Sequence, residues 1–197
     1  MIKKYRNTAH IFKFPNIDLG KREDFLILGK SGVGKTTFLY LLAGLLKPIS
    51  GKIIINKIEF NSLTKNKLDE FRGRNIGLVF QKKHPIKSFN VIENLKARLF
   101  LVKKIEILLT QLNIAELKKS NIHKLSEGQL QRLGIALSVI HNPQVILADK
   151  PTSSLDDENC KIVIELLKHQ AKQANANLIV ITHDQRIKPF FQNSIAL

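Results

Sequence analysis

A glycine-rich segment constrains this chain more than any other part of it. The segment reads Gly29-Lys30-Ser31-Gly32-Val33-Gly34-Lys35-Thr36 and fits the pattern Gly-x4-Gly-Lys-Thr. Residues 24–28 before it predict a short apolar strand, and residues 37–46 after it predict a helix stopped at Lys47-Pro48. In a P-loop of this kind, backbone N–H groups and the positive end of the helix surround a phosphate. The sequence therefore predicts a phosphate-binding site.

The rest of the chain alternates short apolar strands with helical patterns. Strands are predicted at 52–55, 57–60, 76–80, 145–148 and 178–181, the first two as a hairpin around Asn56. Helical spacing is predicted at 91–140 and 158–174. This order indicates an α/β P-loop NTPase fold: a mostly parallel sheet flanked by helices, with a small antiparallel β region. We expect one domain over 1–197, with an inserted helical lobe at approximately 85–140.

Composition favours a soluble domain. The longest apolar stretch, 38–46, falls well short of the roughly 20 residues that a membrane span needs. No apolar core with a cleavage site follows the basic start, so we expect no signal peptide and a cytoplasmic location. The single cysteine, Cys160, has no partner for an internal disulfide and is expected to be inert.

The net charge of +16 leaves two interpretations open. It could mark a face for nucleic acid or for an anionic membrane surface. Alternatively, it reflects a solvated lysine surface, because the lysines are scattered beside many Asn and Ile residues. Pairs occur at Lys3-Lys4, Lys82-Lys83, Lys103-Lys104 and Lys118-Lys119. We favour the solvated surface and expect no dedicated nucleic-acid binding.

Four polar or glycine positions lie just past predicted strand ends. They are Gly29, Gln81, Asp149 and His183. Ligands of parallel sheets bind at the carboxyl ends of the strands, so one site can collect all four. Lys35 is expected to reach the β- and γ-phosphates of a nucleotide, and the Thr36 hydroxyl to ligate Mg²⁺ together with Asp149.

Four further motifs complete a family resemblance. Leu125-Ser126-Glu127-Gly128-Gln129 resembles the signature LSGGQ, and Phe80-Gln81 the Q-loop. The stretches 153–156 and 181–184 are similar to the D-loop and the switch-histidine loop. In this order the motifs resemble the ATP-binding cassette of the ABC superfamily, over 24–184. The wording Leu-Ala-Asp-x-Pro-Thr around Asp149 is most similar to the lipoprotein-release and macrolide-export branch.

The resemblance implies a dimer with ATP and Mg²⁺ as cofactors. Two cassettes would pack head to tail, each ATP lying between the P-loop of one and the signature of the other. A transmembrane permease would bind in the cleft beside the Q-loop and helical lobe, at the inner face of the cell membrane. The implied nucleotide-binding residues are Gly29, Lys30, Ser31, Gly32, Val33, Gly34, Lys35, Thr36, Thr37, Ser126, Gly128 and Gln129. The implied metal ligands are Thr36, Gln81 and Asp149, and the catalytic positions are Gln81, Lys150 and His183.

Two positions depart from the family pattern. Lys150 stands where the family has the glutamate that activates water, and a lysine ammonium has three donors and no acceptor. We therefore expect tight ATP binding with hydrolysis slowed by orders of magnitude. Glu127 replaces the first glycine of the signature and is expected to point to solvent.

The sequence leaves alternatives open for the residue that stacks on adenine and for the function of the chain. Tyr5 fits by spacing as the aromatic that stacks on adenine, and Phe12 or Phe14 fits less well. Besides a transport ATPase subunit, the chain could be an ATP-sensing adaptor without turnover. A third interpretation is a non-transport cassette acting on nucleic acid.

Overall fold

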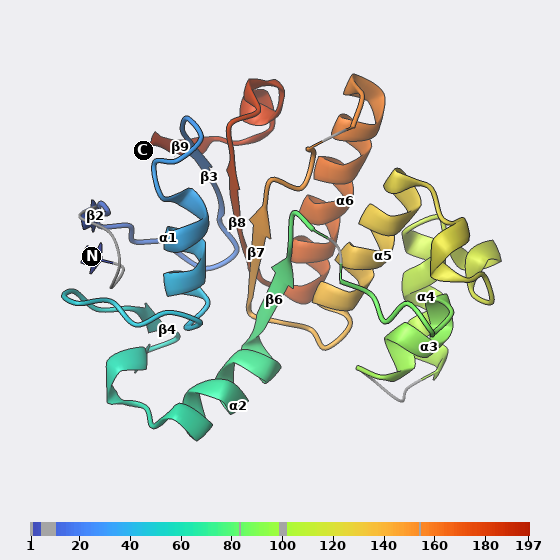
Figure 1. Cartoon of the computed structure of the whole chain (residues 1–197), viewed down its shortest axis with the longest axis horizontal. Coiled ribbons are helices and arrows are strands. Elements are labelled where there is room, and N and C mark those ends of the chain that lie inside the picture. Colours follow the sequence, from blue (N-terminus) through green and yellow to red (C-terminus); the bar gives the residue numbers. More distant parts are fainter. Residues whose placement is uncertain (1, 5–10, 83, 99–101, 154) are drawn as a thin grey trace.

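A five-stranded parallel sheet forms the centre of the molecule. The computed structural model describes residues 2–4, 11–82, 84–98, 102–153 and 155–197. The strands lie in the order β6 (Ile76–Val79), β7 (Val145–Asp149), β8 (Asn177–Thr182), β3 (Asp24–Leu28) and β9 (Asn193–Ala196). Every pairing in this sheet is parallel, as the sequence predicts. All the carboxyl ends therefore meet at one edge (Figure 1).

Helices cover both faces of the sheet. α1 (Lys35–Leu42) lies on one side, and α5 (Glu127–Val139) and α6 (Asp157–Ala174) lie on the other (Figure 1). Successive side chains of β3 enter different cores: Ile27 packs with the α1 side, and Leu26 with the α5 and α6 side. Because both faces are buried, the inner strands β3, β7 and β8 are largely apolar.

Two small antiparallel sheets flank the α1 side. β1 (Ile2–Lys4) pairs with β2 (Ile11–Lys13), and β4 (Ile54–Ile55) pairs with β5 (Ile58–Glu59). Asn56 and Lys57 turn the second hairpin with φ angles of 49° and 65°, the left-handed values that a two-residue hairpin turn requires. The predicted hairpin is present but shorter, because a 3-10 turn, η1 (Phe60–Ser62), begins at Phe60.

The P-loop helix ends earlier than the sequence predicts. The prediction of a helix to residue 46 is wrong, since α1 stops at Leu42. Gly44 adopts a left-handed φ of 67°, and the N–H groups of Leu45 and Leu46 turn back to the Tyr40 carbonyl. This is the ordinary glycine termination of a helix, and it acts before the proline does.

A polar helix, α2 (Lys65–Asn75), was not predicted. Thr64 caps it by accepting from the Lys67 N–H, and Leu68 is its one buried residue. Its apolar stripe is therefore too narrow to show as helical periodicity. The remaining helical elements are α3 (Val91–Lys96), α4 (Val102–Gln111), η2 (Ala115–Leu117), η3 (Ile122–Lys124) and η4 (Gln185–Phe190).

Two glycines allow close backbone contacts around the sheet. A Cβ on Gly77 of β6 would lie 2.3 Å from the Ser138 carbonyl oxygen, so α5 rests directly on this strand. A Cβ on Gly29 would lie 2.8 Å from the Leu197 carbonyl oxygen, and the Leu197 N–H donates to the Leu28 carbonyl at 2.8 Å. The last residue therefore adjoins the first residue of the P-loop.

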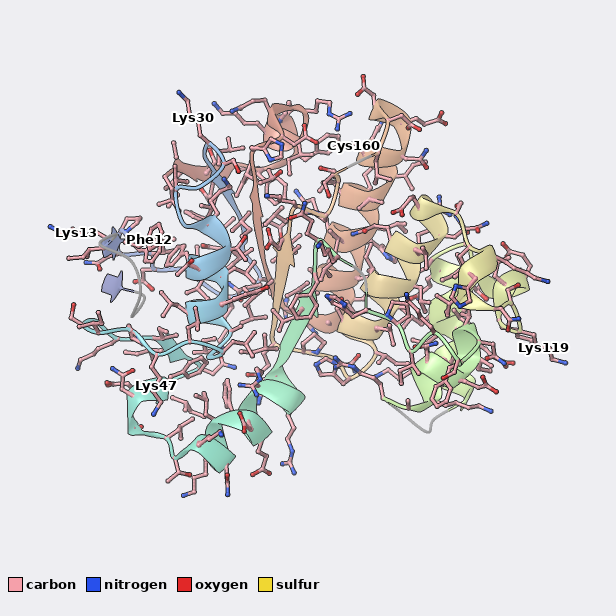
Figure 2. All side chains as sticks on the ribbon, in the orientation of Figure 1. Phe12, Lys13, Lys30, Lys47, Lys119 and Cys160 are labelled. Carbon is pink, nitrogen blue, oxygen red and sulfur yellow. The ribbon has the colours of Figure 1, made fainter. Side chains whose placement is uncertain are left out.

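Lysines occur in several separate regions of the surface. Figure 2 shows Lys13, Lys30, Lys47 and Lys119 at widely separated outer points of the molecule. Within the described ranges, no helix combines the length and apolar character needed to cross a bilayer.

Candidate functional site

The carboxyl edge of the sheet carries the four predicted strand-end residues. Gly29 and His183 directly follow β3 and β8. Asp149 is the last residue of β7, and Gln81 lies two residues after the end of β6. The pairing register sets Leu28 beside Thr182 and Asp149 beside Ile181, so neighbouring strands end at similar heights. Four adjacent strands thus present these residues along one edge (Figure 1).

The P-loop curls around its own lysine. Gly32 and Gly34 have φ angles of 87° and 95°, which an L side chain rarely adopts. Lys35 is 4% exposed, and its Nζ donates to the carbonyl oxygens of Gly29 and Lys30 at 2.7 Å each. The first turn of α1 holds no acidic residue, so its positive end is left for an anion.

Thr36 and Asp149 form the part of the site suited to a metal. Thr36 Oγ1 donates to Asp149 Oδ2 at 2.8 Å. Asp149 is 4% exposed, and its Oδ1 is buried with no hydrogen-bond partner in the described part of the chain. Burial raises the pKa of this carboxyl, against the lowering effects of the Thr36 bond and of Lys150 and Lys35. A buried carboxylate oxygen left over beside a hydroxyl fits Mg²⁺, which prefers oxygen ligands.

Lys150 adds a second cation to this cluster. It has a left-handed φ of 46°, and its N–H donates to the Ile181 carbonyl at 2.8 Å. The pKa of Lys35 is lowered, first by burial and then by the Lys150 charge, while Asp149 opposes the shift. The charges of Lys35 and Lys150 therefore both act on Asp149, and a site with this excess of positive charge attracts an anion.

The other predicted site residues lie further along the edge. His183 is exposed directly after β8. Gln81 is exposed after β6 and lines a pocket together with Glu127 and Ser153. Of the three predicted metal ligands, Thr36 and Asp149 are hydrogen-bonded to each other. Gln81 instead lies beside the predicted signature.

The signature begins α5. The Ser126 side chain accepts from the Gln129 N–H at 3.3 Å, and the Gln129 side chain accepts from the Ser126 N–H at 2.9 Å. This capping box fixes the helix start, and Glu127 is exposed as expected. In Figure 1 this end of α5 and the P-loop stand on opposite sides of β7 and α6. A signature so placed lies apart from the P-loop of its own chain.

Two of the three candidate aromatics lie in the described residues. Phe14 is buried and stacks on Phe38 with ring centroids 4.6 Å apart. The Phe12 ring lies against the P-loop, because a Cβ on Gly34 would be 2.5 Å from it. Phe12 belongs to β2, and in Figure 2 it lies on the side of β2 that faces α1. Tyr5, the first choice from spacing, lies outside the described residues.

Arg186 is a residue that sequence reasoning did not select. Its guanidinium bonds to Asp184, to Asp157 and to the Leu155 carbonyl, and so joins two of the loops at this edge. No motif marks it. The one available signal was its position three residues after His183.

The Asp149→Asn variant is expected to be at least as stable as the natural chain without nucleotide, by up to about 1 kcal/mol. The raised pKa means that the ionised carboxylate opposes folding at neutral pH, so removing its charge relieves that cost. The added stabilisation that Mg²⁺ gives in the presence of ATP should disappear. Thermal unfolding with ATP, with and without Mg²⁺, measures both effects. A Mg²⁺ increment equal to that of the natural chain would contradict the assignment.

Comparison with known proteins agrees with this geometry. A family model described as "ABC transporter" matches residues 12–153. The lipoprotein-releasing system ATP-binding protein LolD of Buchnera aphidicola is 36% identical over 193 residues, covering 92% of this chain and 85% of that protein. LolD of Legionella pneumophila strain Paris is 35% identical, with coverages of 95% and 87%.

Solved structures give the same result. The ATP-binding cassette MJ0796, described as dimeric in a post-hydrolysis state bound to ADP and Pi, has a TM-score of 0.89 and 30% identity. That match covers 100% of this chain and 91% of that one. The structure of cbiO1 from Clostridium perfringens, part of the transporter complex cbiONQ, has a TM-score of 0.90 and 27% identity, with coverages of 99% and 81%. The chain belongs to the ABC transporter family, as one of its ATP-binding subunits.

Proposed function

We propose that this subunit works as an ATP-held clamp: it binds Mg-ATP, dimerises around two nucleotides and hydrolyses them slowly. The observation that carries the proposal is the cluster of Lys35 and Lys150 around Asp149. Both ammonium groups would face a phosphate on the P-loop. Neither can accept a proton from water while charged.

Each residue of the cluster has a separate task in this proposal. Lys35 exchanges its two carbonyl partners for the β- and γ-phosphates. Thr36 and Asp149 hold Mg²⁺, which when bound spreads the negative charge of the phosphates. Lys150 adds a charge beside the γ-phosphate, and His183 contacts the same group. Binding is thereby strengthened, while the group that would activate water is missing.

Dimerisation is supported by the position of the signature. The start of α5 offers Ser126 and the N–H groups near Gly128 as an anion site that the chain's own P-loop does not meet. The cassette MJ0796 is described as a dimer bound to ADP and Pi. A head-to-tail pair would bring each signature onto the nucleotide of the other cassette.

A cleft beside the Q-loop supports the proposal of a permease partner. The cleft has a volume of about 310 Å³ and is lined in part by Phe80, His84, Arg98 and Gln131. Gln131 is 3% exposed, and its Nε2 has no partner among the described residues. Such a donor is costly unless a ligand or partner carbonyl meets it. We propose that the helical lobe, at approximately 85–140, receives a cytoplasmic segment of the permease here.

The names of the relatives refine the transporter class. Several are ATP-binding proteins of lipoprotein-releasing systems, and we propose a permease of that type, with this subunit peripheral at the inner face of the membrane. The comparisons do not favour the sensing adaptor or the nucleic-acid cassette, since the relatives named are transporter subunits.

Mg-ATP is expected to convert the chain from monomer to dimer, as measured by analytical ultracentrifugation. Gly128→Asp should weaken this dimer at least about tenfold, because a carboxylate would meet the partner's γ-phosphate. The monomer has room for the change, since the nearest atom to a Cβ there is Asn159 Oδ1 at 3.7 Å. ATP binding by single cassettes should not change.

A mixed sample gives the sharpest control. Gly128→Asp chains keep a working P-loop, and Lys35→Met chains keep a working signature. Mixed together, they should form heterodimers that hold one ATP and that are stronger than the homodimers of either variant. Failure of the natural chain to dimerise, or failure of the mixture, would refute the head-to-tail clamp.

A further inference from the structure

One guanidinium joins the loop after β8 to the loop that begins α6. Nε and Nη2 of Arg186 donate to Oδ1 and Oδ2 of Asp184, at 2.9 and 2.8 Å. Nη1 donates to Asp157 Oδ1 at 2.6 Å and to the Leu155 carbonyl at 3.2 Å. We call this set the Arg186 tie. It links the residue after His183 to the backbone of the D-loop.

Asp184 anchors the tie to the sheet edge. Its Oδ2 also accepts from Thr152 Oγ1 at 2.8 Å, and Thr152 is fully buried two residues after Lys150. The bonds from Arg186, opposed by burial, lower the pKa of Asp184 to about 2. The carboxylate is therefore ionised throughout the neutral range, and its two oxygens hold the guanidinium through two hydrogen bonds.

We propose that Arg186 is a positioning residue that makes the D-loop and the switch-histidine loop move as one unit. The inference rests on the proposed function, because the coupled movement matters when two cassettes close around ATP. His183 and the Leu155 carbonyl lie on loops held by the same guanidinium. A displacement of His183 toward phosphate is therefore passed to the backbone beside Asp156. Among the described residues, the bonds of Arg186 go to these loops and not to the P-loop.

The simpler interpretation is a surface ion pair that only steadies α6. The side chains of Arg186 and Asp157 are 41% and 88% exposed, and exposed pairs contribute little to stability. The two interpretations differ in what the D-loop does when nucleotide arrives. Arg186→Gln tests this, because it removes the bonds to Leu155, Asp157 and Asp184 together. Asp157→Asn is the milder variant, because it removes only the charge of the Asp157 contact and leaves the Leu155 bond and the Asp184 half in place.

Hydrogen exchange on single cassettes tests the tie without any dimer. In the natural chain, ATP should slow amide exchange both at 183–185 and at 155–157. In Arg186→Gln, ATP should slow exchange at 183–185 but no longer at 155–157, and in Asp157→Asn the slowing at 155–157 should be reduced. Lys188→Gln removes an exposed positive charge from the same 3-10 helix and should behave like the natural chain. Unchanged protection of 155–157 in both tie variants overturns the proposal.

Dimerisation gives the second measurement. Each tie variant should weaken the ATP dimer by about two- to fivefold, the range for partly exposed pairs, with ATP affinity of the monomer unchanged. The double variant should be no weaker than Arg186→Gln alone, because both changes cut one connection. Additive losses would overturn the tie. If the natural chain does not dimerise at all, the clamp fails, and the exchange result still decides the tie independently.

Discussion

The Lys150→Glu variant is expected to hydrolyse ATP roughly 10² to 10⁴ times faster than the natural chain, the range that a positioned general base contributes. Glutamate at this position would supply the acceptor that an ammonium lacks. The backbone already sets the position of this residue, since the N–H of Lys150, directly after β7, donates to the Ile181 carbonyl of β8. Phosphate release under saturating Mg-ATP measures the rate.

Lys150→Gln is the matched control for this experiment. Glutamine has nearly the shape of glutamate and removes the same positive charge, but it is not a base. If charge removal alone sped up the reaction, both variants would gain equally. A natural chain that hydrolyses ATP as fast as Lys150→Glu would show that another group activates water. The dimer should also become shorter-lived in the glutamate variant, because turnover removes the nucleotide that holds it.

Adding the same methyl group to two glycines is expected to change stability in opposite directions. Gly77→Ala should lower the free energy of unfolding by about 1 to 3 kcal/mol, because its Cβ would meet the backbone of α5 at Ser138. Gly73→Ala should raise it by about 0.4 to 1 kcal/mol. Gly73 lies within α2 with nothing within 4 Å of a new Cβ, and alanine favours helix.

Urea unfolding of the two variants beside the natural chain measures the difference. The Gly77 change should also weaken ATP-dependent dimerisation, since α5 carries Ser126 at its start and a shifted helix misplaces it. Equal stability of the two alanine variants would show that β6 and α5 can move apart freely. That result would remove the reason for expecting a displaced signature.

Sequence reasoning found the parts of the fold whose signals are local. The strand at 24–28 matches β3, because a buried parallel strand is a short apolar run bounded by turn residues. The four strand-end residues follow from the same rule, since parallel strands share one carboxyl edge. The end of α1 was misjudged because Gly44 terminates the helix before the proline.

The missed features depend on contacts between distant residues. β9 contains the polar residues Asn193 and Ser194 and is a strand through its pairing with β3. Arg186 reads as one more surface cation until folding brings it within 2.6 Å of Asp157. Neither pairing leaves a spacing in the chain that a pattern could detect.

The contact between Leu197 and Gly29 determines where a reporter group can be attached. A group attached at Leu197 would lie beside the P-loop, at the proposed nucleotide site. A fluorophore is better placed on α2, at the opposite edge of the sheet in Figure 1, where Asn66 is exposed. The only native thiol, that of Cys160, is 2% exposed, so a maleimide dye would label Asn66→Cys selectively and report on the cassette without touching its site.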